Sequence, residues 1–93
     1  MTSARVLATE DAKTAAVQMV GDAGHLHDQI GKVVVEGDKL ADPNQWDGKL
    51  AQQWRGDWTN DKKQLQDAAS KLDDLQKKAQ KAVQDILHAG GDA

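Results

Sequence analysis

The chain has 93 residues, the size of one small domain. Its 12 basic and 15 acidic residues give a net charge of −3, and it contains neither Phe nor Tyr. The acidic balance and the scarcity of aromatic side chains argue against nucleic-acid binding. No run of eighteen apolar residues is present, so we expect no transmembrane helix and no stable membrane insertion. The absence of Cys excludes disulfides and thiolate metal sites.

The first predicted helix covers about residues 9–39. Thr9 is a suitable N-cap, and Glu10 and Asp11 place negative charge at the positive end of the helix dipole. Gly37 is a candidate C-terminal cap, although Leu40 could extend the helix by one more turn. Apolar or small residues then recur in the steps of four and three that are typical of a packed helix: Met19, Ala23, Leu26, Ile30, Val33, Gly37 and Leu40.

Glycines weaken this first helix. Each costs roughly 1 kcal/mol relative to alanine in a helix interior, so the helix should depend on packing for its stability. Gly24 and Gly31 share one side of the helix, where they either permit the close approach of another backbone or are simply tolerated.

A bend is predicted at about residues 38–44. Pro43 disfavours helical geometry in the residue before it, and it is well suited to the first position of a new helix with Asp42 as its N-cap. The second helix is therefore predicted to cover about residues 43–88.

The second helix has the more regular pattern, and its heptad register passes through Gly56 without a skip. His88 would lie in its last turn, and Gly90 and Gly91 would end it before a short tail. Acidic and basic residues spaced four apart support the exposed side: Asp67 with Lys71, Asp73 with Lys77, and Asp74 with Lys78. The predicted stripe is Leu50, Trp54, Trp58, Asp61, Leu65, Ala68, Leu72, Leu75, Ala79, Ala82 and Ile86.

These elements predict an all-α fold of two long antiparallel helices, a helix-turn-helix hairpin. A lone hairpin buries little apolar surface, and it would leave Val20, Val34, Trp46, Val83 and Leu87 in water. We therefore predict a four-helix bundle dimer, formed by two identical or two related hairpins. The stripe residues expected to form its interfaces are Met19, Leu26, Ile30, Val33, Leu65, Leu72, Leu75 and Ile86.

The motif Trp-x-Gly occurs twice, as Trp46-Asp47-Gly48 and as Trp54-Arg55-Gly56. A hairpin of this length with Trp-x-Gly at the bend resembles the WXG family, the ESAT-like (Esx) small proteins of bacterial type VII secretion. We assign Trp46 and Gly48 as the bend motif, because Trp46 follows Pro43 and because the heptad pattern continues through Gly56. Trp54, Gly56 and Trp58 are then the second motif copy and packing residues of the second helix.

The resemblance implies a protein that is made in the cytoplasm and then secreted or held at the cell envelope through type VII secretion. It would act as effector, co-substrate or targeting partner, and its implied partners are a related hairpin, a secreted toxin or the secretion ATPase. The first thirty residues lack the features of a secretory signal, which fits another export route.

The chain differs from the family in its export signal. The family's Tyr-x-x-x-Asp/Glu motif has only a degenerate counterpart here, from His88 to Asp92, since the chain has no Tyr. This departure keeps open an alternative function, a cytoplasmic adaptor or immunity-like binding protein that is not exported.

The sequence indicates neither a metal site nor a catalytic site. His25 and His27 point about 200° apart on a helix, so they cannot share a metal ion, although His25 and Asp28 could. The two serines, Ser3 and Ser70, would lie far from every His, and the carboxylates alternate with lysines as on a solvated surface. We expect no enzyme, no cofactor and no metal.

Overall fold

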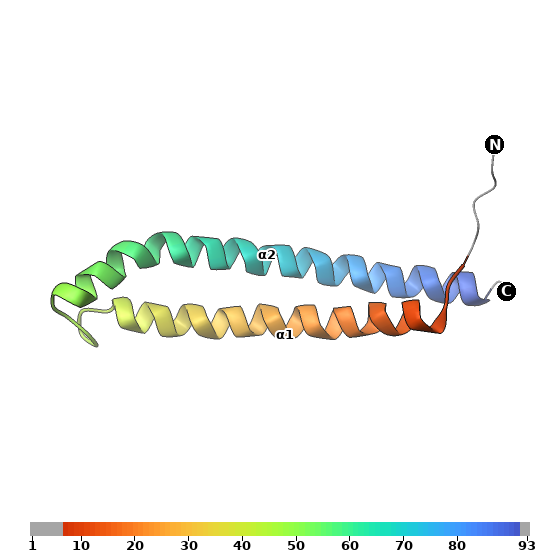
Figure 1. The fold of residues 1–93 in the computed structure, drawn as a ribbon, viewed down its shortest axis with the longest axis horizontal. Helices are drawn as coiled ribbons and strands as arrows, with labels where there is room; N and C mark the ends of the chain where they lie inside the picture. The colour runs from red at the N-terminus through yellow and green to blue at the C-terminus, as the bar shows by residue number, and fades with distance from the viewer. Residues whose placement is uncertain (1–6, 92–93) are drawn as a thin grey trace, which may run out of the picture.

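The computed structural model describes residues 7–91, and these form one helical hairpin. Helix α1 (Glu10–Ala41) and helix α2 (Lys49–Gly91) run antiparallel beside each other, as Figure 1 shows. The molecule measures 65 × 27 × 15 Å. The predicted all-α hairpin is confirmed, and no strand occurs between residues 7 and 91.

Helix α1 begins where the sequence indicates. The Thr9 side chain accepts a hydrogen bond from the backbone nitrogen of Ala12 at 3.1 Å, which caps one of the free amides at the helix start. At its other end α1 continues to Ala41, so Gly37 lies inside the helix and not at its cap. The 32 residues of α1 include the β-branched run Val33–Val35.

The connection between the helices is a tight turn built on Asp42. Its carboxylate accepts from the amide of Asn44 at 2.9 Å, and its carbonyl accepts from the amides of Gln45 and Trp46 at 2.9 and 3.0 Å. Gly48 follows with a φ of 114°, a conformation that residues with a Cβ rarely adopt.

This turn moves the start of the second helix. The predicted helix from about residue 43 begins only at Lys49, because Asp42 bonds to the turn that follows it and does not cap α2. The positive φ of Gly48 separates that turn from the first helical residue. The connection therefore covers residues 42–48, and α2 continues to Gly91, three residues past the predicted end.

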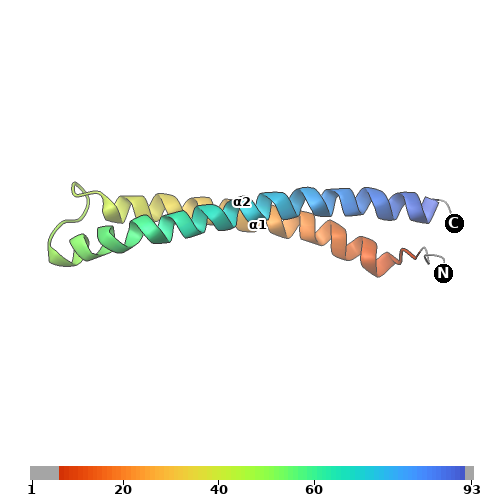
Figure 2. The same cartoon turned by 90° about the horizontal axis from the view of Figure 1, so that it is seen from above.

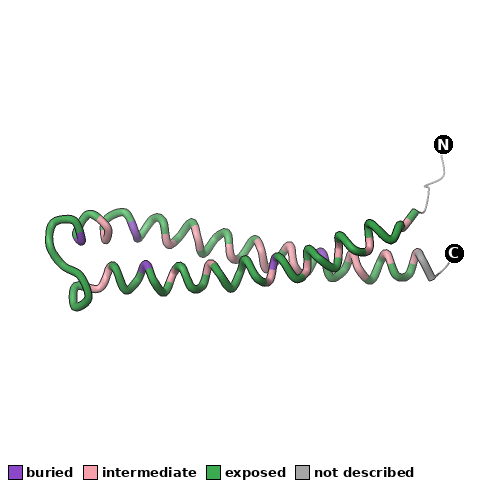
Figure 3. Tube along the Cα trace, turned by 60° about the horizontal axis from the view of Figure 1, so that its bottom comes forward, coloured by how far each residue is buried: buried purple, intermediate pink, exposed green. Residues whose placement is uncertain are grey.

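The two helices touch along a narrow line. Near the bend, α2 bows away from α1 and then returns toward it (Figure 1), and seen from above the two helices cross at a shallow angle (Figure 2). Buried positions are few and scattered along the inner edges of the helices (Figure 3). Among residues 7–91 the buried hydrophobic side chains are Ala23, Ala51, Trp58 and Ala79, and no large side chain is fully buried.

On α1 several residues that contact α2 are the ones directly after the predicted stripe residues. Val20 and Val34, which were expected in water, are half-buried against α2, whereas Met19, Leu26 and Val33 are exposed. The predicted stripe and the observed line of contact both contain Ala23, Ile30 and Gly37, and they differ in the other positions. We call the actual line of contact on α1 the seam: Ala16, Val20, Ala23, Ile30, Val34, Gly37 and Ala41.

Candidate functional site

Two tryptophans join the helices next to the bend. The rings of Trp54 and Trp58 stack with their centroids 5.5 Å apart and their planes 15° from parallel. Trp58 Nε1 donates to Asp38 Oδ1 at 2.9 Å, and Trp54 Nε1 donates to the Gly37 carbonyl at 3.1 Å. We call Gly37, Asp38, Trp54 and Trp58 the tryptophan clasp. It satisfies both indole N–H groups while it covers the inner side of α2.

The clasp depends on a glycine in α1. Gly37 is buried beneath the six-membered ring of Trp58, and a Cβ added at this position would overlap that ring. A larger residue would hold the two helices apart at this point. Gly37 is therefore a close-approach position and not a cap.

Lys62 of α2 forms an ion pair with Asp38 of the clasp. Its Nζ lies 3.0 Å from Asp38 Oδ1 and 3.1 Å from Oδ2, which links α2 to α1 a second time. The hydrogen bond from Trp58, and then the contact with Lys62, hold the pKa of the Asp38 carboxyl below its ordinary value. Asp38 is thus ionised at neutral pH.

The first Trp-x-Gly copy lies in the connection and the second lies inside α2. Arg55 donates from Nη1 to the Trp46 carbonyl at 3.2 Å and from Nη2 to Asp47 Oδ1 at 2.9 Å, and so holds the connection against α2. The amide of Gly48 and then Arg55 hold the pKa of Asp47 below its ordinary value. Trp46 is 37% exposed, unlike Trp58 at 6%.

One broad side of the hairpin is apolar. On α1, Met19, Leu26, Val33 and Leu40 recur every seven residues beside the seam and are between 43% and 55% exposed. Met19 and Leu26 line a groove of about 400 Å³ with Leu72 and Leu75 of α2, so both helices contribute to the same side. We define the apolar face as Met19, Leu26, Val33 and Leu40 of α1 with Trp54, Ala68, Leu75 and Ala82 of α2, a row that Asp61 interrupts.

The opposite side of the hairpin has a smaller groove. A groove of about 260 Å³ there is lined by Val17, Val20, Gln80, Val83 and Gln84. The row of α1 that borders this side continues from Val17 through Gly24 and Gly31 to Asp38. A Cβ at Gly31 would meet nothing within 4 Å, so Gly31 serves no close approach within the hairpin.

The stripe residues Ile30 of α1 and Leu65 and Ile86 of α2 lie along the inner side of the helices and are half-buried. Leu72 and Leu75, which line the groove of the apolar face, are half-buried as well. Leu50, at the start of the predicted stripe, is 68% exposed, and Ala51 beside it is buried. Of the three predicted helical ion pairs, the described residues form one, between Asp73 and Lys77 at 3.1 Å. A further pair that was not predicted joins Lys81 to Asp85 at 3.0 Å.

The other sequence-derived candidates lie apart from these features. His27 Nδ1 contacts Asp28 Oδ1 at 3.5 Å, and no group of three His, Asp or Glu side chains suited to a metal ion occurs between residues 7 and 91. His88 is exposed near the end of α2, and Asp92 lies outside the described residues. Neither described helix is both long and apolar enough to cross a membrane.

Sequence reasoning missed the polar links between the helices. Gln76 Nε2 donates to the Val20 carbonyl at 3.1 Å, across the seam beside Gly24. The roles of Asp38 and Arg55 were also missed, because a charged residue on a helix gives no signal of its partner until the register of the two helices is known.

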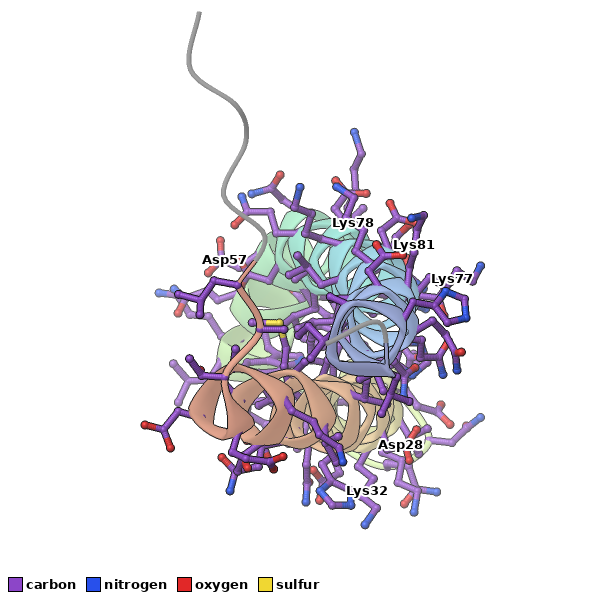
Figure 4. The ribbon with its side chains drawn as sticks, turned by 90° about the vertical axis from the view of Figure 1, so that its right-hand side faces the viewer. Asp28, Lys32, Asp57, Lys77, Lys78 and Lys81 are labelled. Atoms are coloured by element: carbon purple, nitrogen blue, oxygen red, sulfur yellow. The ribbon has the colours of Figure 1, made fainter. Side chains whose placement is uncertain are left out.

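The tryptophan clasp, the bend and the apolar face are the main structural features of the hairpin. Charged side chains elsewhere project outward, as Asp28 and Lys32 do from α1 and Lys77, Lys78 and Lys81 do from α2 (Figure 4). Comparisons with known proteins found no matching family model, no similar curated protein and no similar solved structure.

Proposed function

We propose that this chain is a binding protein and not an enzyme, and that it acts by packing against another helical hairpin. The observation that carries the proposal is the mismatch between the length of the helices and the size of the core. Helices of 32 and 43 residues bury only four hydrophobic side chains, three of them alanines. Long helices gain most of their stability from packing, so a hairpin with so small a core is better stabilised with a partner.

The exposed apolar residues support the same proposal. The row on α1 from Met19 to Leu40 provides the third apolar position per heptad that helices in bundles use in addition to their seam. Charged residues are absent from this row on α1. A second hairpin placed there would complete a four-helix bundle.

The biological setting that we propose is type VII secretion, with the chain as effector, co-substrate or targeting partner resembling the WXG family. The support is the Trp-x-Gly at Trp46 and Gly48 in the connection of a two-helix hairpin of this size. In this setting the bundle is what the export machinery or a toxin partner recognises.

A secretion assay tests that setting. The chain is expressed in its host with an active secretion ATPase and with an ATPase-dead variant, and culture filtrates are compared. We expect the chain in the filtrate only when the ATPase is active. Its retention in the cell in both strains, while it still binds a helical partner there, would reject the setting and leave the binding function.

That second result would favour a cytoplasmic adaptor or immunity-like protein. The specific observation behind this alternative is the absence of Tyr, so the chain carries no Tyr-x-x-x-Asp/Glu signal of its own. Co-expression with the protein encoded by the neighbouring gene separates the cases further. A signal-bearing neighbour that restores export would identify the chain as a co-exported partner.

A further inference from the structure

We propose that the bond between Asp47 and Gly48 is the site at which this chain rearranges spontaneously to isoaspartate, and that Arg55 restrains the rearrangement. The reaction needs no enzyme, only an Asp side chain that reaches the amide nitrogen of the next residue. It changes the connection between the helices and is independent of the binding function proposed above. The sequence of the connection, the position of the Gly48 amide and the contacts of Arg55 support it together.

Asp47 differs from the other aspartates in the residue that follows it. It forms the one Asp-Gly pair of the sequence, and glycine has no Cβ that would shield its amide nitrogen. Asp42, also in the connection, precedes Pro43, which has no N–H proton to lose. The other described aspartates lie inside α1 or α2, where helical and capping hydrogen bonds hold the backbone amides. Asp47 is therefore the aspartate best placed to react.

The Gly48 amide faces the carboxylate that it would attack. It donates to Asp47 Oδ1 at 2.8 Å, and because Oδ1 is bonded to Cγ, the nitrogen lies next to the carbon with which a five-membered ring would form. A Cβ built on Gly48 would meet nothing within 4 Å, so the space beside this residue is open. The Asp47 side chain is 61% exposed, and water therefore reaches the reacting atoms.

The rearrangement conserves atoms. The Gly48 nitrogen loses its proton and its electron pair forms a bond to Asp47 Cγ, while one oxygen of the protonated carboxyl leaves as water with both protons. In the resulting succinimide ring the nitrogen is bonded to Cγ and to the Asp47 carbonyl carbon. Water then adds to one of these two carbons and breaks its bond to nitrogen. Addition at Cγ restores aspartate, whereas addition at the carbonyl carbon gives isoaspartate, a product of unchanged mass.

Arg55 opposes the first step. Its Nη2 donates to Asp47 Oδ1 at 2.9 Å and its Nη1 donates to the Trp46 carbonyl at 3.2 Å, so the guanidinium holds both the side chain and the backbone before it. The Gly48 amide and then Arg55 hold the pKa of the Asp47 carboxyl below its ordinary value. At neutral pH the carboxyl is therefore ionised and lacks the proton that must leave with its oxygen.

Isoaspartate at this position would loosen the connection. The backbone gains one methylene group between Trp46 and Gly48, and the carboxylate moves away from Arg55. The Gly48 carbonyl, which accepts from the amide of Gln52 at 3.0 Å, is displaced from the start of α2. We therefore expect faster amide hydrogen exchange in the first turn of α2 in the modified chain.

Peptide mapping of the aged chain tests the site. The purified chain is incubated at neutral pH and physiological temperature and is digested with trypsin, which releases residues 40–49 as one peptide. We expect two chromatographic forms of equal mass, of which only the form that grows with time is methylated by an isoaspartate-specific carboxyl methyltransferase. Deamidation of Asn44 changes the mass and is thereby distinguished. Asp47→Glu, whose ring would need one more atom, should give a single form.

Two variants of α2 test the restraint. Arg55→Gln removes the charge that pairs with Asp47 and should raise the rate of isoaspartate formation roughly two- to fivefold, the factor that corresponds to one exposed ion pair. The matched control is Lys62→Gln, which removes the ion pair with Asp38 near the same end of the hairpin. It leaves the contacts of Asp47 in place, so its rate should equal that of the wild type.

Either part of the proposal is open to contradiction. Equal rates in the wild type and in Arg55→Gln would overturn the restraint by Arg55. Absence of isoaspartate at Asp47 in both chains, under conditions in which the free peptide of residues 40–49 forms it, would overturn the site itself.

Discussion

At the scale of single residues, the hairpin depends on contacts between Gly37, Asp38 and the two stacked tryptophans. Trp58, which is 6% exposed, is the only large hydrophobic side chain that is buried among residues 7–91, and it rests on a glycine. The indole is held in place because its N–H has a carboxylate acceptor and its ring has no Cβ beneath it. The packing of the two helices near the bend therefore depends on the contacts of Trp58 with Gly37 and Asp38.

Gly37→Ala should destabilise the protein although alanine is the better helix former. The added methyl group overlaps the Trp58 ring, and overpacking of this kind costs about 1–3 kcal/mol, more than the roughly 1 kcal/mol gained in helix propensity. The measurement is the midpoint of urea unfolding, followed by circular dichroism. Gly31→Ala is the control, since its Cβ meets open space and should raise the midpoint.

Asp38 should make stability depend on acidic pH. Its folded pKa is lowered from 3.8 by the hydrogen bond from Trp58 and by Lys62, so its stabilising effect is present above pH 3.8. The effect is lost as the pH falls through the lower folded pKa. The urea midpoint, measured at a series of pH values, should therefore begin to decrease once the pH falls below 3.8.

Asp38→Asn separates this contribution from general acid effects. The amide retains an acceptor for Trp58 but removes the charge that pairs with Lys62. The variant should be less stable than the wild type at neutral pH and should lose less stability on acidification. Identical acid dependence in both proteins would show that Asp38 is not the group responsible.

At the scale of the elements, the sequence predicts two helices well and their contact line less well. Heptad spacing and the Thr9 cap are local signals, and the structure follows them. On α1, however, large apolar residues occupy two adjacent rows, one through Val20 and Val34 and the other through Met19 and Leu26. Spacing alone cannot tell which row meets α2, because the choice depends on the shape of the opposing helix.

The start of α2 was misplaced for a similar reason. Asp42-Pro43 is compatible both with a helix start and with a turn, and the decisive feature is the backbone conformation of Gly48 five residues later. The tryptophan clasp could not be predicted at all, since it requires the register that brings Trp58 to Gly37.

The two Trp-x-Gly copies should respond oppositely to alanine. Gly48→Ala places a Cβ at a φ of 114°, and strain of this kind costs about 1–3 kcal/mol. Gly56→Ala lies inside α2 with open space around it and should gain roughly 0.5–1 kcal/mol. Thermal unfolding of the two variants checks the difference, and a stabilised Gly48→Ala would contradict the observed bend geometry.

At the scale of the whole molecule, the hairpin is an extended rod with one apolar side. Its largest dimension is 65 Å and its smallest is 15 Å, so almost every residue lies near the surface. Such a shape buries too little apolar area to be stabilised by a single core of the usual kind. The helical partner that we propose would pack along the rod and bury more apolar area.

Solution scattering measures this central claim most directly. Small-angle X-ray scattering of the chain at micromolar concentration should give twice the chain mass of 10.1 kDa with a largest dimension close to the 65 Å of one hairpin. Doubled mass at unchanged length requires pairing side by side, whereas end-to-end contact would lengthen the particle. A fully helical particle with the mass of one chain, both alone and in the presence of the protein encoded by the neighbouring gene, would contradict the account.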